Sequence, residues 1–159
     1  MNLLVALGLS IGILAGIWAQ VSILPAIALP TFVGVISWAC FYAVGGKKEG
    51  LLKTVTCNLS GVLWGFVVVL IFKALAGALP GAALGIAVAI GCFIMVIQAN
   101  IKILSFIPGT FAGAAAFFGT NFDWQKTAIA LVIGALLAFL SEVIGTALSN
   151  MGKSTKAKS

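Results

Sequence analysis

The chain has 159 residues, of which 62% are apolar, and it carries nine lysines, three acidic residues and no histidine. So few charged side chains cannot cover a water-soluble globule, and the composition indicates an integral membrane protein. No metal-ligand cluster, nucleotide-binding loop or nucleophile–base pair occurs in the sequence. We therefore expect no enzymatic activity, no cofactor and no bound metal.

Apolar runs between polar breaks predict six membrane-crossing segments, each close to the roughly 20 residues that a span needs. The runs lack the alternation of barrel strands, and lipid does not tolerate unpaired backbone groups, so we predict an all-α fold. In chain order the predicted spans are 3–19, 24–44, 53–75, 80–99, 103–119 and 127–149. They form a single domain, 1–151, followed by a basic cytoplasmic tail, 152–159.

The lysines predict the orientation of the chain. If both termini are cytoplasmic, only Lys73 and Lys126 fall on the outer side of the membrane. The other seven then fall at inner ends, as the positive-inside rule expects: Lys47, Lys48, Lys53, Lys102, Lys153, Lys156 and Lys158. The lysines of the tail can also attract anionic lipid. Without a folded basic face, nucleic acid is not an expected partner.

Two stretches of the chain repeat each other, 20–34 and 98–113. Each has a glutamine ten residues before a proline, and the proline precedes Thr-Phe with one extra glycine in the second copy. In the predicted topology the two stretches cross the membrane in opposite directions. This arrangement is typical of inverted-repeat transporters, whose broken helices meet near mid-membrane. We predict repeat halves of about 1–78 and 79–151, with helices 2 and 5 broken by Pro and Gly.

The glycines allow two other interpretations. A threefold repeat would align the glycine pairs Gly12/Gly16, Gly61/Gly65 and Gly109/Gly113 at intervals of about 49 residues. Small residues four apart also let membrane helices pack closely without any role in transport. Packing is the more ordinary role for these glycines, and the same holds for the cysteines and for Trp38 and Trp64.

The candidate pathway lies at the two breaks. Pro108 removes a backbone donor and Gly109 tolerates close approach, which together favour a kink or break. Thr31 and Thr110 would place hydroxyls in one shared polar cavity. The neighbouring Phe32 and Phe111 would narrow the passage, unless these phenylalanines face lipid and the threonines bond their own helices.

Three further polar residues lie within predicted spans. Asn58 and Gln98 could contact a solute or join helices by hydrogen bonds. Glu142 is the only acidic residue inside a span, where a charge is costly enough to suggest a functional role. It lies roughly 10 Å from the cytoplasmic end of its helix, within reach of lysines such as Lys102. A structural ion pair or a shallow, hydrated carboxylate is the alternative.

Three motifs resemble those of a family of small bacterial inner-membrane proteins, catalogued as domain of unknown function one-zero-nine-seven. They are Gly12 to Trp18, Ser60 to Gly65 and, most specifically, Ser105 to Gly113, and the resemblance covers nearly the whole chain. It implies a multi-span protein of the bacterial cytoplasmic membrane. The resemblance implies no particular substrate and no particular site residues.

The sequence thus predicts a channel or secondary transporter for a small polar solute, with the pathway between helices 2 and 5. The alternative is a non-transporting membrane interaction protein, held together by glycine-mediated helix packing. In the transporter, six helices either enclose the pathway alone or line it in a homo-oligomer. The sequence leaves these choices open.

Overall fold

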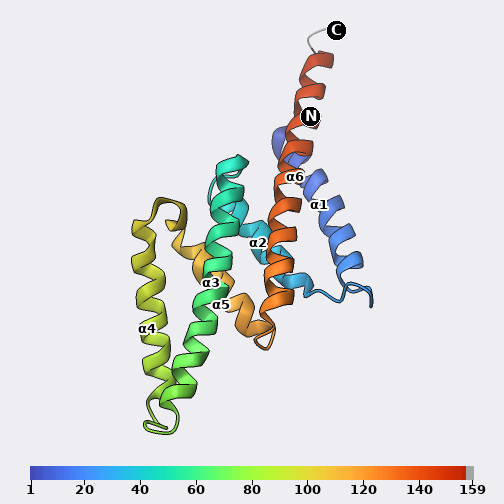
Figure 1. Ribbon diagram of the computed structural model, residues 1–159. Coiled ribbons are helices and arrows are strands. Elements are labelled where there is room, and N and C mark those ends of the chain that lie inside the picture. Colours follow the sequence, from blue (N-terminus) through green and yellow to red (C-terminus); the bar gives the residue numbers. More distant parts are fainter. Residues whose placement is uncertain (157–159) are drawn as a thin grey trace.

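The computed structural model describes residues 1–156 and contains only helices in that range (Figure 1). The α-helices are α1 (Leu3–Ser22), α2 (Thr31–Ala43), α3 (Lys47–Leu75), α4 (Ala83–Ile97), α5 (Ile107–Gly119) and α6 (Trp124–Lys156). Two 3₁₀ turns, η1 (Gln98–Asn100) and η2 (Lys102–Leu104), join α4 to α5. The all-α prediction is confirmed. Part of the predicted tail continues α6 as far as Lys156, and 157–159 lie outside the described residues.

Four of the helical segments are long and apolar enough to cross a membrane: Leu3–Ser22, Lys47–Leu75, Ala83–Asn100 and Trp124–Met151. The other two helices, α2 and α5, have 13 residues each and so extend only about 20 Å. That is less than the roughly 30 Å of a hydrocarbon core. Six full spans, as predicted, are therefore not seen in this structure.

The prolines explain why these two helices are short. Pro30 is the N-cap of α2, and Pro108 lies in the first turn of α5. Proline lacks a backbone donor, so it is tolerated at the first turn of a helix but disrupts a helix interior. Each predicted broken span is thus a segment without α-helix followed by a short α-helix, rather than a long helix with a kink.

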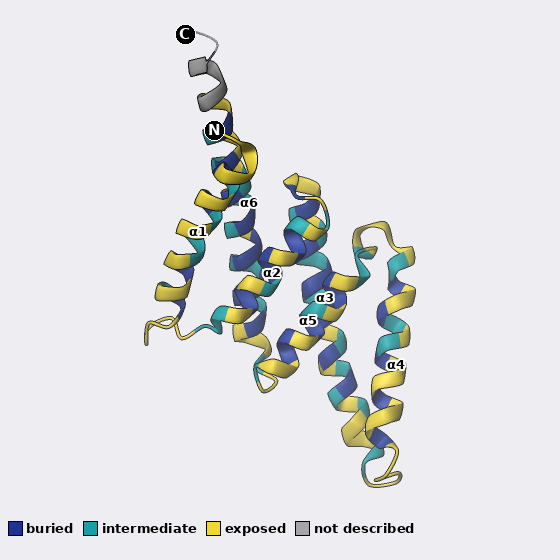
Figure 2. Ribbon diagram, turned by 180° about the vertical axis from the view of Figure 1, so that it is seen from behind, coloured by how far each residue is buried: buried dark blue, intermediate teal, exposed yellow. Residues whose placement is uncertain are grey.

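Each short helix packs against the long helix of the other half of the chain. The most extensive helix contacts are between α3 and α5 and between α2 and α6. The outer helices follow the same arrangement, since α1 packs on α6 and α4 packs on α3 (Figure 1). Buried residues follow α3, α5 and α6, whereas α1 and α4 expose much of their surface (Figure 2).

Glycines make both main contacts possible. A Cβ on Gly61 of α3 would overlap the carbonyl oxygen of Thr110, and one on Gly113 of α5 would overlap that of Asn58. In the second contact, a Cβ on Gly134 of α6 would overlap the carbonyl oxygen of Gly34. The backbones therefore touch directly, as small residues allow in membrane helices.

The glycines of α1 do not have this role. A Cβ on Gly12 or Gly16 would meet nothing within 4 Å. The threefold interpretation expects these positions to resemble Gly61 and Gly65, which are tightly packed against α5. The structure does not support that interpretation.

Helices α2 and α5 match each other at a spacing of 76 residues. Their buried positions coincide at this spacing, including the largest, Phe41 and Phe117. Their ends carry the same backbone hydrogen bonds: Gly46 N–H donates to Phe41 and Phe122 N–H donates to Phe117. Aligning the two Pro-Thr-Phe motifs instead requires a spacing of 79 residues between the threonines. The two spacings differ by three residues, which is nearly one helical turn.

Candidate functional site

Gln98 lies where α4 ends, and its side chain joins three segments of the chain. Its amide oxygen accepts hydrogen bonds from Ser60 Oγ at 2.6 Å and from Trp64 Nε1 at 2.8 Å. Its Nε2 donates to Thr110 Oγ1 at 2.9 Å. Gln98 is 8% exposed and Thr110 is fully buried. We name these four side chains the Gln98 cluster.

The Gln98 cluster lies deep along the molecule. Ser60 and Trp64 flank the middle of α3, roughly 16 Å or more from either end of that helix. The break that follows Gln98 is also held against α3, because Thr56 Oγ1 donates to the carbonyl oxygen of Ile103 at 3.0 Å. Non-helical backbone at such depth is tolerated only when protein or a polar cavity surrounds it.

A second polar group faces α2 from α3. Asn58 is fully buried, and its Nδ2 donates to Ser37 Oγ at 2.9 Å. Its amide oxygen has no hydrogen-bond partner, and neither has the hydroxyl of the fully buried Thr54. Residues 54 and 58 are four apart, so both side chains lie on the same face of α3. If the amide were turned over, its nitrogen would lack a partner instead. We name Thr54 and Asn58 the α3 polar pair.

Buried polar atoms without a hydrogen-bond partner are unusual in a membrane protein. A buried polar atom without a partner costs about 1–3 kcal/mol, and native structures keep few of them without a bound water or ligand. Among the described side chains, the only other such atom is Trp38 Nε1. The α3 polar pair therefore offers free hydrogen-bonding capacity inside the helix bundle.

Thr31 belongs to a different group of side chains. Its hydroxyl lies 2.6 Å from Ser22 Oγ, and its carbonyl oxygen accepts a hydrogen bond from Trp18 Nε1 at 2.9 Å. Thr110 instead joins the Gln98 cluster, so the structure does not place the two threonines in one shared cavity. In the register of the short helices, Thr110 corresponds to Gly34.

The phenylalanines face outward. Phe32 is 45% exposed and Phe111 is 39% exposed, so in this structure they do not narrow a passage. Lipid solvates an aromatic ring as well as a protein core does, and nothing drives these side chains inward. Pro108 and Gly109 lie at the start of α5, where a Cβ on Gly109 would come within 3.2 Å of Cys57 Cβ.

Glu142 binds the beginning of α3. Its carboxylate accepts a hydrogen bond at 2.7 Å from the backbone N–H of Lys47, the first residue of that helix. The first N–H groups of a helix lack intrahelical partners and favour a negative charge. The preceding Gly46 has φ +67° and packs against the carboxylate. The predicted partner Lys102 instead lines a separate hollow with Glu49 and Lys53. The contact supports the structural interpretation of Glu142.

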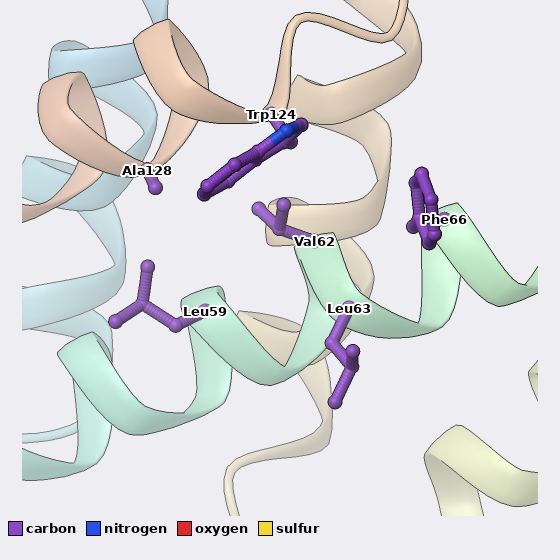
Figure 3. Close-up of a pocket in the computed structure, with 6 residues that line it drawn as sticks. All are labelled: Leu59, Val62, Leu63, Phe66, Trp124 and Ala128. Carbon is purple, nitrogen blue, oxygen red and sulfur yellow. The ribbon is translucent and has the colours of Figure 1, made fainter.

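A hollow beside the middle of α3 has a mostly apolar lining. It has a volume of about 600 Å³ and is lined by Leu59, Val62, Leu63, Phe66, Trp124 and Ala128 (Figure 3). Leu63 is 58% exposed and Trp124 is 54% exposed, so this hollow suits hydrocarbon rather than a polar solute. Among the described residues, no group of three His, Cys, Asp or Glu could hold a metal ion.

The structure thus unites Gln98 and Thr110, places Asn58 on the neighbouring face of α3, and separates Thr31 and Glu142 from them. Sequence reasoning missed Ser37, Thr54 and Ser60 and treated Trp64 as packing. The four-residue spacings of Thr54/Asn58 and of Ser60/Trp64 were the available signal, because such pairs share a helix face.

Three bacterial proteins resemble the chain over most of their length. Uncharacterized protein YahC of Escherichia coli (strain K12) is 33% identical over 156 residues, covering 94% of each protein. Inner membrane protein YcdZ of the same organism is 36% identical over 142 residues, 87% of this chain and 83% of that protein. Inner membrane protein YcdZ of Salmonella typhimurium (strain LT2) is 34% identical over 141 residues, covering 87% and 85%. No solved structure matches the chain.

These relatives and the long apolar helices make the chain a multi-pass protein of the bacterial inner membrane. The resemblance found in the three glycine-containing motifs is confirmed. A profile of the family described as "Protein of unknown function (DUF1097)" matches residues 8–146, and the chain therefore belongs to that family.

Proposed function

We propose that this protein carries a small uncharged polar solute across the inner membrane. The observation that carries the proposal is the α3 polar pair, whose amide oxygen and hydroxyl are buried without partners. A solute that leaves water loses hydrogen bonds, and polar atoms inside the membrane replace them. A polar atom that is already hydrogen-bonded to protein must break that bond before it can bind a solute. The free atoms of the α3 polar pair can bind a solute without breaking any bond.

The chemistry of the site favours a neutral solute. Asn58, Thr54 and Ser37 are uncharged, as are the side chains of the Gln98 cluster. The carboxylate of Glu142 is engaged by the start of α3. A proton-coupled weak acid, which would require that carboxylate, is less well supported than a urea-like or glycerol-like molecule.

The tight helix crossings favour a transporter over an open channel. The backbones of α3 and α5 are in direct contact at Gly61 and Gly113. We propose that the α3 polar pair is exposed to one side of the membrane at a time, by movement of α2 or α5. The breaks before these helices, at 23–30 and 98–106, supply the backbone freedom for such a movement.

We further propose that residues 3–75 and 83–151 are an inverted repeat in the 76-residue register. The matched burial of α2 and α5 and the crossed packing on α6 and α3 support it. In a structure determined in a lipid bilayer, rotation about an axis in the membrane plane should place Phe41 on Phe117. A best superposition that pairs Thr31 with Thr110 would reject this register.

We propose that both termini are cytoplasmic. The start of α3 and the connection from α4 to α5 lie toward the end of the molecule that holds both termini (Figure 1), and their sequences contain Lys47, Lys48, Lys53 and Lys102. In a variant without native cysteines, Ser159→Cys should react with an impermeant maleimide only after cells are opened. Gly77→Cys, in the α3–α4 turn, should react in intact cells. The opposite labelling pattern would reverse the topology.

The transport proposal is tested by removing the free hydrogen-bonding atoms. Thr54→Val keeps the volume of the side chain but removes its hydroxyl, and Asn58→Leu removes the amide. In proteoliposomes, each variant should reduce uptake of the transported solute at least several-fold. Thr54→Val should also melt at or above the wild-type temperature, because it removes a buried hydroxyl that has no partner.

Thr56→Val is the matched control for this experiment. It makes the same chemical change two residues away, on the side of α3 that faces Ile103 rather than α2. Its uptake rate should fall much less than that of Thr54→Val or Asn58→Leu. Equal uptake by Thr54→Val, Asn58→Leu and the control would mean that the α3 polar pair does not contact the solute.

A second function has a specific observation in its favour. The centre of the molecule is packed through glycines, and the hollow beside Trp124 is mostly apolar. Both features suit a membrane interaction protein that does not transport. Such a protein would show no solute uptake at all, in the wild type or in any variant.

A further inference from the structure

A groove of about 520 Å³ runs along the outer face of α6, near the start of α3. One side of it is apolar. Phe139, Val143 and Ala147 follow one another at intervals of four residues and so form a continuous stripe about 12 Å long. Val143 is 50% exposed, which leaves the stripe open to the surrounding hydrocarbon.

The other side of the groove is polar. Glu142, Thr146 and Asn150 form a second stripe with the same spacing, and the exposed Lys47 and Lys48 stand at its edge. The carboxylate of Glu142 already accepts the backbone N–H of Lys47. With two exposed lysines and one carboxylate, the lining has a net charge of +1.

We propose that this groove binds an anionic phospholipid from the surrounding leaflet. Its phosphate would lie between Lys47 and Lys48, its headgroup hydroxyls would meet Thr146 and Asn150, and one acyl chain would follow the apolar stripe. A soluble anion would use the lysines but not the apolar stripe. A neutral lipid would leave the positive charge uncompensated.

The test is lipid retention in native mass spectrometry of the detergent-solubilised protein. It is titrated separately with phosphatidylglycerol, phosphatidylethanolamine and phosphatidylcholine of matched chains. Phosphatidylglycerol should be retained at least several-fold better than the other two. Removing one lysine should lower the retention of phosphatidylglycerol about fivefold, since each lysine contributes about 1 kcal/mol near a membrane surface.

The double variant Lys47→Gln with Lys48→Gln should lose the preference for phosphatidylglycerol. Lys73→Gln, an exposed lysine at the opposite end of α3, is the matched control and should keep it. Val143→Ser should weaken retention of all lipids by removing apolar contact. Melting temperatures of the variants check that each one is folded.

Equal retention of the three lipids by the wild type would overturn the proposal, as would a double variant that still prefers phosphatidylglycerol. If phosphatidylethanolamine binds as well as phosphatidylglycerol, then Glu142 pairs with its ammonium group and the assignment of an anionic lipid is wrong. The assay contains no transport step, so its result is independent of whether the protein carries a solute.

Discussion

Replacing Gly61 with alanine should almost abolish the folded protein. The new Cβ would overlap the backbone carbonyl oxygen of Thr110, and no change of side-chain rotamer can relieve contact with a backbone atom. Helix α5 would have to move away from α3 along the most extensive helix contact in the structure. We expect a loss of about 3 kcal/mol or more, seen as aggregated material in size-exclusion chromatography and a collapse of the melting transition.

Gly12→Ala is the matched control for that variant. It adds the same methyl group to a membrane helix, but nothing lies within 4 Å of the new atom. It should express, elute and melt like the wild type, or slightly above it because alanine favours helix. Equal behaviour of Gly61→Ala and Gly12→Ala would show that the two backbones do not touch as described.

The second large effect is expected for Gln98→Leu. Leucine fills similar space but removes all three hydrogen bonds of the Gln98 cluster, so Ser60, Trp64 and Thr110 lose a shared partner. With about 1–3 kcal/mol for each buried group left unpaired, the variant should lose roughly 3 kcal/mol of stability. The readout is the melting temperature in detergent.

Asn100→Leu tests whether that loss is specific to the Gln98 cluster. Asn100 lies two residues further along the same break, is exposed, and donates only to the carbonyl oxygen of Ile97. Its replacement should lower the melting temperature only slightly. The double variant Gln98→Leu with Thr110→Val should lose less stability than the two single variants lose together, because both changes remove the same hydrogen bond. Additive losses would argue against that bond.

The sequence predicted where the chain breaks but not which residues the breaks bring together. Proline acts through its own backbone, so Pro30 and Pro108 mark the starts of short helices without knowledge of the neighbours. The pairing of Thr31 with Thr110 depended on sequence similarity alone. Burial follows the packing of whole helices instead, and that packing aligns Phe41 with Phe117.

Inward and outward faces could not be predicted for the same reason. In a membrane, apolar side chains suit both the bundle interior and the lipid, so Phe111 carries no signal of its direction. The glycines illustrate the limit further. Gly12/Gly16 and Gly61/Gly65 have the same spacing, yet only the second pair meets another helix. Polar residues were better guides, because Asn58 and Gln98 must be buried in protein within lipid.

The central claim is that the α3 polar pair serves a small uncharged solute, and solute uptake by wild-type protein tests it most directly. Sealed proteoliposomes are mixed with urea, formamide or glycerol in a stopped-flow instrument, and their re-swelling is followed by light scattering. We predict that at least one of these solutes enters several-fold faster than it enters protein-free liposomes, while sucrose stays excluded from both. Re-swelling at the protein-free rate with every solute, by protein that is folded and inserted, would contradict the account.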